Sequence, residues 1–275
     1  MNRTLIGVCA LLTLAACGGG EGAPKPASNN GGSKPAVTND TPKADDTKPA
    51  AQDPTPSGGK QDWADSMGTA TVSGKIAFDG DAPVMPVIDM SSDPKCLTDG
   101  TTEESVVVND GGLANCIISV TKGLDGYEFG DGSGKVMVDQ KGCKYIPHVV
   151  AMQAGQTISI SNSDDTVHNV HSYSKRNQAF NQAQPAGAAA IEKEMGRKDK
   201  MFPVKCDMHS WMNCHVAVFD HPFFTTSDAS GNFTLPKLPA GTYTVTAEHE
   251  TLGKQEVSVT VADGATATAA MTFKK

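Results

Sequence analysis

Short runs of Val, Ile, Thr and Phe, separated by Gly, Asp and Pro, follow one another along the chain after Trp63. In several runs, such as 256–261, apolar and polar residues alternate, and a period of two is typical of strands with one buried face. The expected strands are 69–78, 104–108, 115–122, 135–139, 148–153, 157–162, 216–220, 231–235, 241–248, 254–261 and 265–273. Only 188–200 has a helical composition, and Gly196 interrupts it, so we expect a short helix or an ordered loop there. The pattern predicts an all-β fold.

The first residues differ from this pattern. Residues 1–16 combine a basic start, a short apolar run and small residues, which is typical of a secretory signal. The run ends in Leu14-Ala15-Ala16-Cys17, which resembles a bacterial lipobox and implies that Cys17 carries lipid; the alternative is an ordinary signal peptide with an incidental cysteine. The residue that follows Cys17 is Gly18 rather than Asp. The resemblance implies a cell-envelope protein that is lipid-anchored to the membrane and faces the periplasm, with the outer membrane favoured, or one on the extracellular surface.

Residues 17–66 are rich in Pro, Ala, Lys and Asp and contain almost no large apolar side chain. Such a segment buries too little surface to offset the entropy lost on ordering, so we expect a disordered tether. The formal net charge of the chain is −8 and no basic run is present, which argues against nucleic acid as a partner.

Two short motifs contain metal-ligating residue types at suggestive spacing. Cys206, His209 and Met212 form a Cys-x2-His-x2-Met segment, and His168 with Asn169 lies upstream. One thiolate, two imidazoles and one thioether are the ligands of a mononuclear blue-copper site. Because such a site suits both Cu(I) and Cu(II), the motif favours electron transfer.

Residues 135–220 resemble the cupredoxin family of blue-copper proteins, and within it the amicyanin- and plastocyanin-like members. The matching segments are Lys144-Tyr145-x-Pro147, 154–162, 168–171 and 206–212. The resemblance implies a Greek-key β-sandwich with one type 1 copper per chain, held by His168, Cys206 and His209 with Met212 as the axial ligand. Asn169 would tie the His168 strand to the Cys206 loop. His171 points to the opposite face of an extended strand and is expected not to bind the metal.

The loop departs from the family pattern in two places. Phe202-Pro203-Val204-Lys205 precedes Cys206 where aromatic residues are usual, and Met208 replaces the usual Pro before His209. These changes leave the ligands intact but leave the rigidity of the loop and the reduction potential open.

Residues 221–275 resemble the carboxypeptidase regulatory-like domain, a small transthyretin-like β-sandwich. The motif is an Asp-x-x-Gly-x-Phe turn at 228–233, followed by Leu-Pro-x-Gly-x-Tyr at 238–243. The first strand of that family is similar to 72–76, which lies far upstream in region 67–134. Two arrangements remain open: one sandwich split around the copper region, or two consecutive domains.

Five cysteines remain after Cys9 in the signal and Cys17 are set aside. If Cys206 is a thiolate ligand, four cysteines are left in an oxidising compartment, and these permit three pairings. We favour disulfides between Cys96 and Cys143 and between Cys116 and Cys214.

The expected function is single-electron transfer with redox partners such as c-type cytochromes or a periplasmic dehydrogenase. No enzymatic activity is expected, because four protein ligands leave no open position for a substrate. Three alternatives remain. They are a copper storage, delivery or sensing protein, with Met195 and Met201 as exchange ligands, a zinc site at Cys206, His209, Cys214 and His215, and a recognition module with a degenerate metal site.

Overall fold

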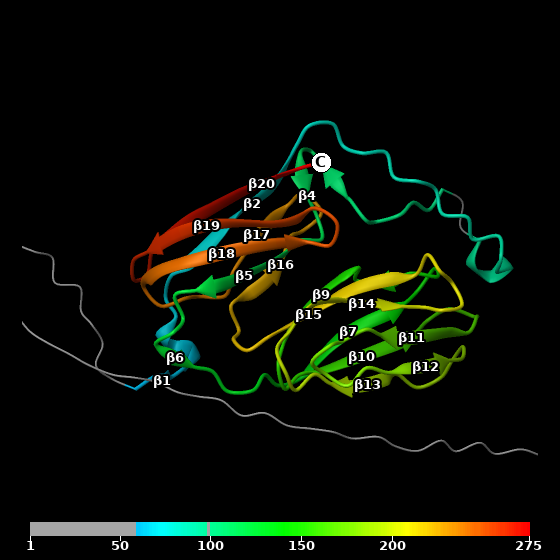
Figure 1. Cartoon of the computed structure of the whole chain (residues 1–275), viewed down its shortest axis with the longest axis horizontal. Helices are drawn as coiled ribbons and strands as arrows, with labels where there is room; N and C mark the ends of the chain where they lie inside the picture. Colours follow the sequence, from blue (N-terminus) through cyan, green and yellow to red (C-terminus); the bar gives the residue numbers. More distant parts are fainter. Residues whose placement is uncertain (1–58, 98–99) are drawn as a thin grey trace, which may run out of the picture. The chain divides into compact units, whose positions relative to one another are not determined.

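The computed structural model describes residues 59–97 and 100–275 (Figure 1). The predicted signal peptide, Cys17 and the tether up to residue 58 lie outside these residues. The elements are β1 (Gln61–Asp62), η1 (Asp65–Met67), β2 (Thr71–Asp79), η2 (Pro94–Cys96), β3 (Val108–Asn109), β4 (Gly112–Leu113), β5 (Ile117–Lys122), β6 (Tyr127–Glu128), β7 (Lys135–Gln140), β8 (Tyr145–Ile146), β9 (Val149–Gln153), β10 (Thr157–Asn162), β11 (His168–Ser172), β12 (Asn181–Gln184), β13 (Ile191–Glu194), β14 (Asp199–Lys205), β15 (Asn213–Phe219), β16 (Phe224–Thr226), β17 (Asn232–Thr234), β18 (Gly241–His249), β19 (Gly253–Val261) and β20 (Thr266–Lys274). The all-β prediction is confirmed. No helix in the described residues is long and apolar enough to cross a membrane.

The first sandwich takes strands from both ends of the described chain. One sheet has the order β16-β5-β18-β19, and the other contains β17, β2, β4 and β3, with β20 also paired to β2. The β2–β20 pairing is parallel and joins Thr71 with Thr266 through Asp79 with Lys274. One buried core includes side chains from both sheets, among them Val72, Ile118 and Val245. The structure therefore splits this sandwich around an inserted segment.

The inserted segment forms the second sandwich, from Lys135 to Phe219. Its sheets have the orders β13-β10-β7-β8 and β12-β11-β14-β15-β9 (Figure 1). A second buried core lies between them and includes Val138, Ile160 and Val216. All described residues belong to one compact unit, and Ile117 of β5 packs with Val149 of β9 and Ala217 of β15 where the two sandwiches meet.

Local chemistry explains the turn motif of the first sandwich. The Asp228 carboxylate accepts hydrogen bonds from the backbone N–H groups of Ser230 and Asn232, both at 2.8 Å. Gly231 has a φ of 80° and lies so close to the backbone of Ile76 that a Cβ would collide with it. Phe233 is then placed in the core, where it is 5% exposed. Asp228 thus caps the turn, Gly231 allows its backbone conformation, and Phe233 anchors the segment in the core.

Two expectations about local structure are wrong. Segment 188–200 is neither helix nor loop throughout, because β13 pairs with the edge of β10 and β14 begins at Asp199. The predicted tether is also too long at its end, since β1 pairs with β6 and the Trp63 ring lies 5.0 Å from the Phe223 ring. Trp63 has enough apolar surface to hold the chain against the core.

Candidate metal centre

The fold brings the two metal motifs together. His168 begins β11, and Cys206 directly follows β14, which pairs antiparallel with β11. The loop after Cys206 is tight: the Met212 N–H donates to the His209 carbonyl at 2.9 Å, and the Cys206 N–H donates to the Met212 carbonyl at 3.1 Å. His209 is thereby turned back over the end of β11.

Three of the predicted ligands converge in the interior. The Nδ1 atoms of His168 and His209 lie 3.0 Å apart, and the Cys206 Sγ lies 3.7 Å from the His209 Nδ1. The three side chains offer ligand atoms that all lie within 4.8 Å of one another. His168 is 0% exposed, Cys206 is 2% exposed and His209 is 4% exposed. Met212 is buried in the same core.

These distances fit one transition-metal ion. Donor atoms about 2.0–2.3 Å from a shared ion lie about 3–4 Å from one another. The Cys206 thiol is free, so its sulfur can act as a ligand. Two imidazoles and one thiol, with a thioether in the same loop, suit copper better than hard cations, which prefer oxygen.

Asn169 holds the sulfur end of the cluster. Its backbone N–H donates to the Cys206 Sγ at 3.5 Å, and its Oδ1 lies 3.3 Å from the same sulfur. The same Oδ1 accepts the Asp207 N–H at 2.6 Å. Tyr145 adds support, because its hydroxyl donates to the Asn169 carbonyl at 2.8 Å. The β11 strand and the Cys206 loop are thus tied together at the sulfur.

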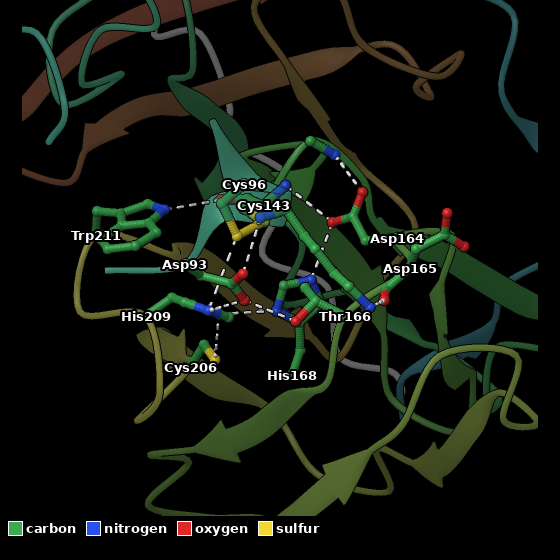
Figure 2. The surroundings of a disulfide bond; sticks show 12 residues. Asp93, Cys96, Cys143, Asp164, Asp165, Thr166, His168, Cys206, His209 and Trp211 are labelled. Carbon is green, nitrogen blue, oxygen red and sulfur yellow. Dashed lines mark hydrogen bonds and ion pairs between the residues drawn. A yellow bond between two sulfur atoms is a disulfide. The ribbon is translucent and has the colours of Figure 1, made fainter. Parts of the chain in front are cut away.

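Two carboxylates that the sequence analysis missed hold the outer nitrogens of the imidazoles. The His168 Nε2 lies 2.9 Å from the Asp164 carboxylate, and the His209 Nε2 lies 3.2 Å from the Asp93 carboxylate (Figure 2). Each contact favours the tautomer that carries a proton on Nε2 and turns the Nδ1 lone pair toward the cluster. Asp164 lies four residues before His168, so the sequence could have identified it as a partner of that imidazole. For Asp93 the sequence offers no such signal except its closeness to Cys96.

The surroundings of the cluster favour protonation states that can bind a metal. Burial lowers the pKa of His168, even though its contact with Asp164 acts in the opposite direction, so the imidazole is neutral at pH 7. Hydrogen bonds from the Thr166 hydroxyl and the Lys95 backbone N–H hold the pKa of Asp93 below its usual range. A neutral imidazole is the form that binds a metal.

A covering loop, residues 86–97, lies over His209. Its Asp93 contacts the His209 Nε2, and its Cys96 Sγ lies 3.8 Å from the same nitrogen (Figure 2). The Lys95 ammonium also donates to the Asp165 carbonyl. The His209 imidazole is therefore covered and presents no exposed edge. Trp211 is half-buried beside it, with the two rings 5.1 Å apart and its indole N–H donating to the Cys143 carbonyl at 3.1 Å.

Of the two disulfides that we favoured, the structure confirms one and lacks the other. Cys96 and Cys143 are joined, which ties the covering loop to the turn before β8. Cys116 and Cys214 are free buried thiols in different cores, so the second pair does not form. Each of these cysteines is buried in the core of its own sandwich, so the two sulfurs do not meet.

Other candidate ligands lie elsewhere. The His171 Nδ1 lies 3.0 Å from the Asp207 carboxylate, and its ring stacks on Tyr173. Among the described residues, no group of convergent ligand atoms combines Cys214 or His215 with Cys206 and His209, as the zinc alternative requires. Met195 is 2% exposed in the core, and Met201 is partly buried against the cluster of Ile117, Val149 and Ala217.

Comparisons with known proteins give one family match and several weak structural matches. The model of the carboxypeptidase regulatory-like domain matches residues 212–274. No curated protein is similar enough in sequence to match the chain.

Solved structures give weak matches to cupredoxins. A Cu(I) form of an amicyanin variant is 20% identical, with a TM-score of 0.28, over 32% of this chain and 85% of that chain. An oxidised amicyanin variant is 22% identical, with a TM-score of 0.28, over 31% and 83%. The Cu-containing nitrite reductase NirK from Thermus scotoductus SA-01 is 16% identical, with a TM-score of 0.28, over 30% of this chain and only 22% of that one. The chain therefore contains a carboxypeptidase regulatory-like domain and has weak structural similarity to cupredoxins.

Proposed function

We propose that this protein carries single electrons by means of one type 1 copper, held by His168, Cys206 and His209 with Met212 as axial ligand. The observation that supports this most directly is the convergence of two imidazole nitrogens and a free thiol in a buried cluster. When bound, copper supplies a Cu(I)/Cu(II) couple. We assign no enzymatic activity to this site, since four protein ligands would leave no position for a substrate.

The surrounding residues keep the donor atoms in place. Asn169 hydrogen-bonds the sulfur, while Asp164 and Asp93 hold the outer nitrogens of the two imidazoles. Burial excludes water from the cluster, so few groups need to move when its charge changes. A rigid, dry ligand set is what a fast electron carrier requires.

The covering loop changes the route by which electrons would leave. Because His209 is buried, a partner cannot contact its imidazole directly. The half-buried Trp211 ring and the exposed Met208, which is 52% exposed, are the nearby side chains at the surface. A redox protein, such as a c-type cytochrome or a periplasmic dehydrogenase, would dock there. Lipid anchoring in the cell envelope would bring the protein to such partners.

Replacing Cys206 with Ala is expected to abolish the intense visible charge-transfer band of the copper-loaded protein. That band requires a thiolate bonded to Cu(II), and no other sulfur in the cluster can provide one. Cys116→Ala is the matched control, because this free thiol is buried in the other core and its loss should leave the band unchanged. Wild-type protein that binds Cu(II) without such a band would disprove the proposal.

Replacing Asp93 with Asn is expected to weaken Cu(II) binding by about 10-fold, the lower end of the effect of losing a carboxylate that supports a metal-bound histidine. The amide keeps the shape of the side chain but removes the charge beside the His209 Nε2. Competition with a chelator of known affinity measures the change. Asp89→Asn is the control, since Asp89 is an exposed residue of the same loop that accepts a hydrogen bond from Ser91. Equal effects of the two variants would show that Asp93 acts only through its negative charge and not through its contact with His209.

A further inference from the structure

A second cluster of metal-ligating side chains lies where the two sandwiches meet. His148 immediately precedes β9, and His215 lies in β15, which runs parallel to β9 with His215 opposite Val149. The His215 N–H donates to the His148 carbonyl at 2.9 Å, which fixes the two residues side by side. Glu250 comes from the turn between β18 and β19 of the other sandwich.

The three side chains converge. The His148 Nε2 lies 2.5 Å from the Glu250 Oε1, and the His215 Nδ1 lies 3.0 Å from the Glu250 Oε2. The ligand atoms of all three residues lie within 4.8 Å of one another. The side chain of His148 is 9% exposed, that of His215 is 17% exposed and that of Glu250 is 7% exposed. The cluster is therefore largely shielded from solvent.

The charge balance of the cluster favours a cation. The Glu250 carboxylate lies against the two imidazoles and provides the acidic group of the cluster. Among the described residues, no Lys or Arg forms an ion pair with it. A buried carboxylate requires a compensating positive charge.

One buried nitrogen of the cluster lacks a hydrogen bond. The His215 Nδ1 lies close to the Glu250 carboxylate, but in the part of the chain that the structure describes it has no hydrogen-bond partner. A buried polar atom without a hydrogen bond is unfavourable. A metal ion bound by this lone pair would remove that cost.

The cluster also borders a cavity of about 180 Å³. Besides His148 and Glu250, the cavity is lined by Lys144, Glu104, Trp211 and Met212. The Lys144 ammonium is paired with the Glu104 carboxylate at 3.1 Å and is therefore not free for Glu250. The cavity is large enough for water, so an ion at the cluster would have room for a water ligand on this side.

We propose that His148, His215 and Glu250 form a second metal site, which binds Zn²⁺ with a water from the cavity as the fourth ligand. Two imidazoles and one carboxylate with an open position are a well-known zinc ligand set. The ion would join the β18–β19 turn of one sandwich to strands β9 and β15 of the other. The three protein ligands of this site differ from those of the proposed copper centre, although Met212 also lines the cavity.

Zinc analysis of the full chain tests the proposal. Glu250→Gln and the matched control Glu248→Gln are dialysed against the same excess of zinc, and bound zinc is measured by elemental analysis. Glu248 lies two residues away and pairs with Lys254 at 3.0 Å, so its loss removes the same charge outside the cluster. The control should bind one more zinc ion per chain than Glu250→Gln. Both variants keep the Cys206 cluster, so zinc bound there cancels in the comparison.

Equal zinc content in two folded variants would overturn the proposal and leave an ion-pair network of two imidazoles and one carboxylate. Circular dichroism establishes whether both variants fold. If Glu250→Gln does not fold, anomalous diffraction from zinc-soaked wild-type crystals decides the question. A zinc peak bonded to the three side chains supports the site, and its absence at saturating zinc rejects it.

Discussion

Replacing Gly74 with Ala is expected to lower the free energy of unfolding by about 3 kcal/mol or more. A Cβ at this position would lie 1.6 Å from the Ala269 carbonyl oxygen and 3.0 Å from the Phe233 ring. The colliding atom belongs to the backbone of β20, which pairs with β2 along its length, so it cannot move without loss of hydrogen bonds. The expected cost lies at or above the upper end of that usual for overpacked cores.

Denaturant unfolding of the two proteins measures this change. Gly130→Ala is the matched control, because a Cβ there has no atom within 4 Å. Its stability should stay within about 0.5 kcal/mol of the wild type, as for most surface substitutions. An equally stable Gly74→Ala protein would mean that β2 and β20 do not pair, and hence that the first sandwich is not built from both ends of the chain.

Replacing both Cys96 and Cys143 with Ser is expected to lower the free energy of unfolding by about 4 kcal/mol. The disulfide spans a sequence separation of 47 residues, and closing a loop of that size removes about this much conformational free energy from the unfolded chain. The loss should also loosen the covering loop, because Cys96 is its covalent connection to the turn before β8. His209 would then become more accessible to solvent.

Unfolding with and without a reducing agent provides the control. Reductant should destabilise the wild type toward the level of the double variant and leave the double variant unchanged. Hydrogen exchange across residues 86–97 reports whether the covering loop opens. A wild type whose stability does not respond to reductant, although its thiols become titratable, would contradict the assigned contribution of the disulfide.

The electron-carrier proposal and the zinc proposal depend on different contacts. The first requires the His168, Cys206 and His209 donors to share one ion, and the second requires Glu250 to face His148 and His215. Either can fail without the other. Both rely on imidazoles whose partners come from distant parts of the chain, and this is also where prediction from sequence was weakest.

Features encoded by neighbouring residues could be predicted. Alternation of apolar and polar residues identified most of the long strands, because one face of each is buried. The Cys206–Met212 loop is closed by hydrogen bonds within seven residues, so its motif is readable locally. The Asp228 turn is another such case.

Features that depend on distant partners could not be predicted from the sequence. The segment from 188 has the composition of a helix, but at 191–194 the open edge of β10 offers backbone partners, and pairing there overrides local preference. Cys116 and Cys214 have no property in the sequence that assigns them to separate cores.

The sequence by itself determined the all-β class, the turn chemistry and the candidate donor residues, since these follow from side-chain periodicity and short-range hydrogen bonding. Only the tertiary structure decided that β2 pairs with β20, that Asp93 covers His209, and that Glu250 meets His148 and His215. These contacts join residues from 35 to 195 positions apart. Their formation depends on the packing of whole sheets, which no local pattern records.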